Sequence, residues 1–273
     1  MKKSIILASF FLTIIMTSCM EEIDLELDRS EFVKLIVEGE VTNIPGPQTV
    51  KLSLTSAYDS NVPCPPATGA HVSVSIDNNV YILPEVSPGV YQTEEFTGQV
   101  GKPHSLSVFY ENVTYTASST MKPAMVIDSL GFKSFPYGKP RDMPHWEILL
   151  YGQDDPDRDD CQLIQYAING EWQDTLLYAG IYADWIVNGQ YINGEQIAIY
   201  STYDETVEVK LRSVSIEEQF LWFVDNMIWA VMPNMFFSPP RANIKGNISN
   251  EALGFFRASA IYETDSYTLN VYE

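Results

Sequence analysis

The chain has 273 residues and is strongly acidic, with 36 aspartate and glutamate residues against 16 lysine and arginine residues and a formal net charge of −20. Such a chain repels polyphosphates and anionic lipid headgroups, so nucleic-acid binding and direct adhesion to an anionic membrane surface are disfavoured. The composition is 45% hydrophobic and 12% aromatic, which indicates a folded chain with one large domain or two small ones.

The first eighteen residues have the order of a secretory signal peptide. Lys2 and Lys3 form a basic start, an apolar run follows, and small residues precede Cys19. A transmembrane helix needs roughly 20 apolar residues to cross about 30 Å of hydrocarbon, and this run is shorter and ends in acidic residues. We therefore expect residues 1–18 to be a cleaved signal rather than a membrane span.

The cysteine at the end of this signal favours lipidation over plain secretion. Met16-Thr17-Ser18-Cys19 resembles a bacterial lipobox, in which the cysteine takes a diacylglycerol and its amine is acylated. Several acyl chains such as palmitate anchor firmly, because each buried methylene contributes about 0.8 kcal/mol. Residues 19–30 resemble the acidic tether of lipoproteins exposed on the cell surface, so we expect an outer-membrane, lipid-anchored protein that faces the exterior. A plain signal peptide is the alternative to lipidation, and a solvated spacer is the alternative to the acidic tether.

Residues 31–122 are predicted to form an immunoglobulin-like β-sandwich. Apolar and polar residues alternate with period two in several short segments, and glycine and proline turns separate them, which is typical of strands in a sandwich. The segments cover residues 34–41, 49–55, 70–76, 104–110 and 113–119. A domain boundary is expected near Pro123.

Residues 123–273 are predicted to form a larger β-sandwich or barrel-like domain, so the fold class is mainly β. Asn-Gly pairs begin at Asn169, Asn188 and Asn193, and such pairs favour type I′ hairpin turns because both residues adopt positive φ. Leu269 and Val271 share one face of a final alternating segment, which predicts a docked terminal strand.

One α-helix is expected at about residues 215–232. Ser215 and Glu218 have the spacing of a capping box, and Pro233 would end the helix. The residues predicted to share its apolar face are Ile216, Phe220, Phe223, Val224, Met227 and Val231. Trp222 and Trp229 lie one heptad apart on a different face. Either they pack between layers of the β-domain, or they dock a partner protein.

Aromatic residues gather in the segment between the first two Asn-Gly pairs and shortly beyond. They are Trp172, Tyr178, Tyr182, Trp185 and Tyr191. Aromatic residues near loop tips offer flat, amphipathic contact area for a sugar or protein, so these residues are candidates for binding a ligand or partner. The alternative is that they fill the core of a β-meander.

The acidic bend at residues 154–160 is the candidate metal site. Asp155, Asp157 and Asp159 are spaced two apart, as in loops that surround Ca²⁺ with oxygen ligands. The glycine at the sixth position and the glutamate at the twelfth position of an EF-hand loop are missing, and this weakens the match to such a loop. Calcium is the only cofactor that the sequence suggests. A solvated hairpin is the alternative.

Two cysteines remain after Cys19. Cys64 and Cys161 could pair in an oxidising compartment. The sequence leaves open whether their Cα atoms come within about 7 Å of each other.

No catalytic constellation is evident in the sequence. The three histidines, His71, His104 and His145, lie in or beside predicted strands. They lack the spacing of a metal site, and no Gly-x-Ser-x-Gly motif accompanies them. We assign no catalytic residue and expect no enzymatic activity.

The C-terminal part carries a family resemblance. It contains "SPPRANIKGNI" followed by "ALGFFRAS", with the motif residues Pro239, Pro240, Asn243, Gly246, Asn247 and Gly254. Together with the early "IVEGEVTNIPGPQTVKLSLT", these segments resemble a Bacteroidetes family of outer-membrane lipoproteins, domain of unknown function 4249. The resemblance spans about residues 19 to 273.

The resemblance implies an accessory role beside a TonB-dependent outer-membrane receptor. Such a protein would capture a ligand or gate the receptor in nutrient or metallophore uptake, without catalysis. The alternatives are a surface hydrolase acting on glycans or peptides, and a structural or adhesive surface protein. The sequence identifies neither the ligand nor the receptor.

Overall fold

A computed structural model describes residues 33–56, 63–135, 143–157, 161–173, 180–183, 188–231 and 244–272. The chain divides into two compact units, residues 1–33 and residues 34–273, and the fold below belongs to the second. The predicted signal peptide, Cys19 and the tether lie outside the described residues. Within the described ranges, no helix has the length and hydrophobicity needed to cross a membrane.

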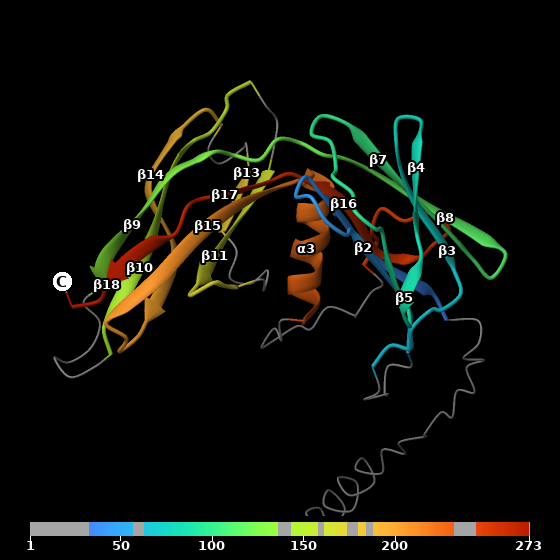
Figure 1. Ribbon diagram of the computed structural model, residues 1–273, viewed down its shortest axis with the longest axis horizontal. Coiled ribbons are helices and arrows are strands. Elements are labelled where there is room, and N and C mark those ends of the chain that lie inside the picture. Colours follow the sequence, from blue (N-terminus) through green and yellow to red (C-terminus); the bar gives the residue numbers. More distant parts are fainter. Residues whose placement is uncertain are drawn as a thin grey trace, which may run out of the picture. The chain divides into compact units, whose positions relative to one another are not determined.

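The first sandwich is built from two sheets that enclose one hydrophobic core (Figure 1). One sheet has the order β16-β1-β2-β6-β5, with bounds Leu253–Ser259, Leu35–Thr42, Thr49–Leu54, Val90–Gln92 and Glu85–Ser87. The other has the order β4-β3-β7-β8, with bounds Asn79–Leu83, His71–Ile76, Pro103–Tyr110 and Val113–Thr120. The prediction of a β-sandwich in the first part of a mainly β chain is confirmed.

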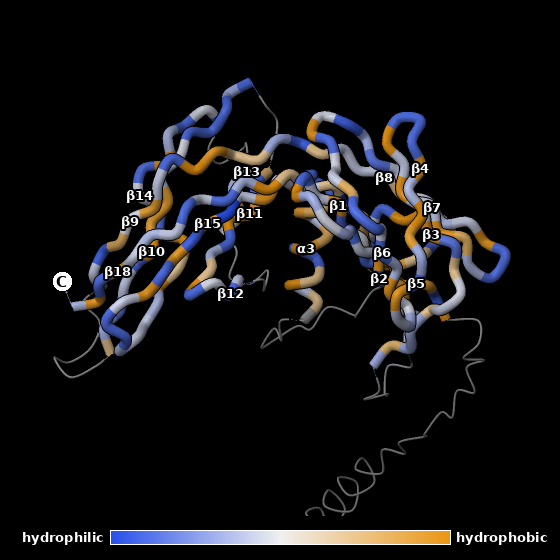
Figure 2. Tube along the Cα trace, in the orientation of Figure 1, coloured by the Kyte–Doolittle hydropathy of each residue, from blue (hydrophilic) through white to orange (hydrophobic). Residues whose placement is uncertain are grey.

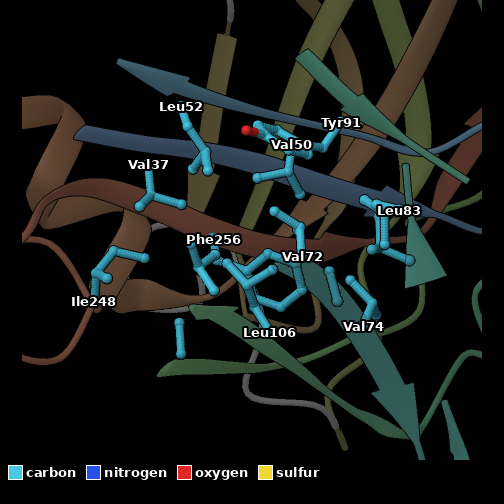
Figure 3. Packing of buried hydrophobic residues seen from close by; sticks show 14 of the residues in the cluster. Val37, Val50, Leu52, Val72, Val74, Leu83, Tyr91, Leu106, Ile248 and Phe256 are labelled. Carbon is cyan, nitrogen blue, oxygen red and sulfur yellow. The ribbon is translucent and has the colours of Figure 1, made fainter. Parts of the chain in front are cut away.

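Alternation along the strands produces this core. Val37 and Val50 from one sheet lie in the same core as Val72 and Val74 from the other (Figure 3). Figure 2 shows hydrophobic and hydrophilic positions interleaved along the strands, because successive side chains of a strand point to opposite faces. The buried Tyr91 hydroxyl donates to the Ala67 carbonyl at 3.0 Å, so this polar group is satisfied within the core.

The C-terminal strand β16 belongs to the first sandwich and not to the second. It runs parallel to β1, from Ile36 opposite Leu253 to Thr42 opposite Ser259. Its Phe256 is fully buried in the core of the first sandwich. The expected boundary near Pro123 therefore does not separate the two sandwiches, because the chain returns to the first after building most of the second.

The second sandwich is likewise built from two sheets around a core. One sheet has the order β14-β10-β9, with bounds Tyr191–Ser201, His145–Gln153 and Ile127–Phe135. The other has the order β12-β11-β15-β17, and β13 and β18 pair with β11 and β15. Its bounds are Glu171–Trp172, Cys161–Ile168, Thr206–Ile216, Ile261–Glu263, Gly180–Ala183 and Tyr267–Asn270. Leu269 and Val271 are buried, so the docked terminal strand is confirmed, as is the mainly β fold class.

The Asn-Gly pairs have two different roles. Asn169-Gly170 closes the β11–β12 hairpin, where Ile168 pairs with Glu171, and Asn188-Gly189 lies in a turn. Gly194, by contrast, lies inside β14 with φ +74°, where the register with β10 shifts. The prediction of a third hairpin at Asn193-Gly194 is wrong, because positive φ serves a bulge as well as a turn.

The helix α3 spans Glu218–Val231, so it begins three residues later than predicted. Ser215 does not cap it, because β15 continues through Ile216. The Ser215 hydroxyl instead donates to the Lys122 carbonyl at 2.6 Å and accepts from the Ala260 backbone N–H at 2.8 Å. The helix packs on the face of β11 and β15 opposite the core of the second sandwich, through Phe220, Leu221 and Val224.

Candidate partner-docking site

The side of α3 that faces away from its packing contacts carries two exposed tryptophans. Phe220 lies 5.0 Å from Phe255 of β16, measured between ring centroids, and holds the buried side. Trp222 and Trp229 are 53% and 54% exposed. Because residues seven apart lie on the same side of a helix after two turns, the two indoles share one solvent-facing surface.

Carboxylates flank these indoles. The Trp222 Nε1 donates to Glu218 Oε1 at 3.1 Å, and the side-chain nitrogen of Asn226 donates to the Trp222 carbonyl at 2.7 Å. Asp225 is half-buried beside them. We call this surface the tryptophan face, and it comprises Glu218, Trp222, Asp225, Asn226 and Trp229. The helix sequence contains no lysine, arginine or histidine. The tryptophan face is therefore negatively charged, and no basic residue of α3 offsets that charge.

Indole faces and carboxylates together suit cationic groups. A guanidinium or ammonium over an aromatic ring is attracted by the ring quadrupole, and a neighbouring carboxylate adds an ion pair. The chain already uses this contact internally. The Arg212 guanidinium carbon lies 4.2 Å from the Trp172 ring centroid, and that of Arg257 lies 4.6 Å from the Phe220 ring.

The aromatic residues predicted as a second binding site do not act as one group in the described residues. Tyr182 is buried in the core of the second sandwich, and this burial raises the pKa of its hydroxyl above the usual value. Trp172 is half-buried beneath Arg212, whereas Tyr191 is exposed. Tyr178 and Trp185 lie outside the described residues. The core alternative therefore holds for Tyr182.

The acidic bend forms a turn in its described part. Asp155 Oδ1 accepts a hydrogen bond from the Asp157 backbone N–H at 3.1 Å. The adjacent Asp154 is buried, and its Oδ2 accepts from Gly189 N–H at 2.7 Å. In the described ranges no group of three or more histidine, cysteine or acidic residues is placed to hold a metal. Asp159 lies outside these ranges, so the three-carboxylate calcium site stays a prediction.

The two cysteines lie in different parts of the fold. Cys64 is exposed, and Cys161 is buried at the start of β11. Cys161 packs in the cluster beneath α3, whereas Cys64 precedes Pro65, whose carbonyl accepts from Leu54 N–H of the first sandwich at 2.8 Å. No disulfide joins these two described residues.

The histidines make separate structural contacts. His104 is fully buried; its Nδ1 lies 3.0 Å from the Lys102 carbonyl, and its Nε2 accepts from the Gln99 N–H at 3.2 Å. Burial lowers the pKa of His104, because desolvation disfavours the charged ring. His71 is exposed and stacks on Phe109, and His145 contacts the Ser201 hydroxyl across β10 and β14.

The described part of the C-terminal motif builds the junction between β16 and β1. A Cβ atom on Gly254 would lie 2.0 Å from the Val37 carbonyl oxygen, and one on Gly246 would lie 1.6 Å from the Gly254 oxygen. The Asn247 side chain accepts from Phe256 N–H at 2.9 Å and donates to its carbonyl at 2.7 Å. These motif residues shape the backbone, whereas Pro239, Pro240 and Asn243 lie outside the described residues.

Comparisons with known proteins bear on the family more than on the site. Among solved structures, the chain is similar to one titled "Cytokine receptor complex - Crystal form 1A", with 8% identity, a TM-score of 0.26, and coverage of 88% of this chain and 97% of that chain. That TM-score supports no inference about fold or function. None of the curated proteins matches the chain. The family model described as "Domain of unknown function (DUF4249)" matches residues 20–265, and the chain therefore belongs to this family.

Proposed function

We propose that this chain is a lipid-anchored, non-catalytic accessory protein of a TonB-dependent uptake system at the outer membrane, and that it docks its partner through the tryptophan face. The observation that carries the proposal is the exposure of Trp222 and Trp229 on a helix whose other side is packed. Tryptophan is enriched among the residues that dominate protein–protein binding energy. Two of them exposed on one helix side favour a binding surface over a structural role.

The shape of the tryptophan face favours a protein partner over a small ligand. At 1.5 Å rise per residue, positions seven apart on a helix are separated by about 10 Å along the axis. Two indoles at that spacing on a convex helix do not enclose a small molecule, whose sites are typically concave. They suit an extended or helical segment that contacts both rings.

The charge of the tryptophan face favours a basic segment of the partner. Glu218 and Asp225 lie beside Trp222, and the whole chain carries a formal charge of −20. A segment with arginine or lysine residues would gain ion pairs and cation–π contacts at the same place. Complementary charge also speeds encounter between the partners.

Anchoring through Cys19 supports a partner in the same membrane. The lipobox-like Met16-Thr17-Ser18-Cys19 would confine the chain to the membrane surface. Confinement raises the effective concentration of a membrane-embedded receptor around the chain. A docking surface of moderate affinity would then suffice for capture of a ligand or gating of the receptor.

Affinity purification of the full chain from native membranes tests this function. We expect a TonB-dependent receptor barrel to be recovered with the wild type and lost with the double variant Trp222→Ala/Trp229→Ala. Tyr203→Ala is the matched control, since it removes an exposed aromatic ring elsewhere and should retain the barrel. Recovery of the chain without a receptor barrel, or equal recovery with the double variant, would overturn the proposal.

A further inference from the structure

The strand β4 lies at an open edge of its sheet. The order β4-β3-β7-β8 places β4 at one end, where it pairs with β3 (Figure 1). The opposite edge is covered, because Ser249 N–H donates to the Thr116 carbonyl at 2.9 Å and the Asn250 side chain donates to the Thr114 carbonyl at 2.7 Å. Among the strands that the structure describes, none pairs with the outer edge of β4.

This edge lacks the features that usually protect an open strand. Natural edge strands carry charges, proline or bulges that discourage pairing with another chain. The five residues of β4 read NVYIL, with no charge and no proline, and their register with β3 is regular. Val80 and Ile82 are 61% and 67% exposed, so the strand presents an apolar and unprotected edge.

The pairing with β3 determines which backbone groups face outward. Ile76 and Asn79 face each other across the two-residue turn that joins β3 to β4. Along an antiparallel strand, the backbone N–H and C=O groups of successive residues point alternately to one side of the strand and to the other. Asn79, Tyr81 and Leu83 therefore bond to β3, and the N–H and C=O groups of Val80 and Ile82 point to the open edge.

We propose that β4 pairs with β4 of a second copy of this chain, in an antiparallel arrangement whose two-fold axis passes beside Tyr81. In this register Val80 of one copy faces Ile82 of the other, and the reverse pair forms by symmetry. Both pairs use the outward N–H and C=O groups, so the two sheets join into one continuous sheet. Contact between β-branched side chains on the same face stabilises such pairs, and a two-fold interface needs only this self-complementary strand.

The charges around β4 favour a second copy in spite of the acidity of the chain. The side chains beside Val80 and Ile82 on the same face are uncharged, since β3 contributes Ser73 and Ser75 there. Like-charge repulsion, which opposes association of acidic chains, is therefore weak at this edge.

At the ends of this register, Asp77 of the β3–β4 turn lies opposite Glu85 at the β4–β5 corner of the second copy. The Lys102 ammonium, 3.1 Å from Asp77, offsets part of this like charge, and Glu85 already accepts from the backbone N–H groups of Gly69 and Gly89 at 2.9 Å. The uncharged strand between these ends, rather than a charge match, is what suits pairing with a second copy.

Sedimentation of the full chain at increasing concentration tests the dimer. We expect the wild type to dimerise and Ile82→Lys to raise the dimer dissociation constant by about tenfold or more, because two ammonium groups would enter an apolar contact. Ile199→Lys is the matched control, since Ile199 is also an exposed isoleucine on an edge strand, β14, and it should dimerise like the wild type. A monomeric wild type, or an unchanged dimer in Ile82→Lys, would overturn the proposal.

Cysteine cross-linking tests the register in a Cys64→Ser background, which removes the exposed native thiol. Facing residues of such a pair have Cα atoms about 5.5 Å apart, within the range that a disulfide spans. We expect an oxidised dimer when Val80→Cys and Ile82→Cys chains are mixed, and far less when either variant is oxidised alone. Equal cross-linking of each variant with itself would show a different register and contradict the proposed two-fold arrangement.

Discussion

Ser119 and Glu217 join the first sandwich to the start of α3. The Ser119 hydroxyl, at the buried end of β8, donates to Glu217 Oε2 at 2.6 Å, and Glu217 Oε1 accepts from the Thr120 backbone N–H at 3.1 Å. The same hydroxyl accepts from the Ala258 N–H of β16 at 2.9 Å. One carboxylate and one hydroxyl thus connect β8, β16 and the residue that precedes the helix.

Glu217→Ala should lower the free energy of unfolding by about 1.5–3 kcal/mol, the range for hydrogen bonds to charged groups. The loss follows because the buried Ser119 hydroxyl would have to find another acceptor. Urea denaturation measures the change. Glu218→Ala is the control, because its exposed carboxylate contacts the Trp222 indole on the same helix and surface substitutions of this kind stay within about 0.5 kcal/mol. Equal losses in both variants would show that the Ser119 contact contributes nothing measurable.

Gly254→Ala should destabilise the protein severely, by about 3 kcal/mol or more. Two effects add, because the backbone there has φ +92° and the new Cβ would lie 2.0 Å from the Val37 carbonyl oxygen. Gly101→Ala separates them, since Gly101 has φ +81° and no atom within 4 Å of the same position. That control should lose only about 1–2 kcal/mol, the cost of the left-handed conformation. Similar values in a denaturant titration would mean that the β16–β1 contact is looser than the geometry indicates.

Local patterns predicted most of the strands but not their distant partners. Alternation in the segment that becomes β1 indicates a strand, because the burial of Val37 and Val41 follows from period two. The parallel neighbour of β1, which begins at Leu253, lies more than two hundred residues away and leaves no periodic signal in either segment. Gly246 and Gly254 were identified in the sequence as residues of the family motif, and the partners of their close backbone contacts became evident in the structure.

The start of α3 shows how tertiary contacts override a local motif. Ser215 and Glu218 have capping-box spacing, yet the Ser215 hydroxyl bonds to Lys122 and Ala260. Those partners come from distant segments, so the sequence window around Ser215 could not reveal them. The heptad spacing of Trp222 and Trp229 was more informative, because spacing on a helix determines a shared side without reference to the rest of the fold.

A fragment of residues 31–122 should fail to fold as a stable sandwich, although it matches the domain expected from sequence. It would lack β16, whose Phe256 is fully buried in that core, and burial of a phenylalanine contributes about 3–5 kcal/mol. Adding residues 244–260 through a flexible linker should restore cooperative unfolding. Circular dichroism melts of the two fragments provide the measurement. Cooperative melting of the shorter fragment would contradict this prediction and would support a domain boundary near Pro123.

Stability should fall as the pH drops below about 6.5, and His104 should account for part of the slope. Its ring is fully buried, and burial lowers its pKa from the ordinary value of 6.5. Below that ordinary pKa the unfolded chain binds a proton that the folded chain does not, so the proton favours unfolding. At higher pH both states hold the neutral ring, and the contribution is fully present. Urea denaturation at several pH values between 7 and 5 should therefore show a shallower slope for His104→Gln than for the wild type. An unchanged slope in His104→Gln would contradict the assignment.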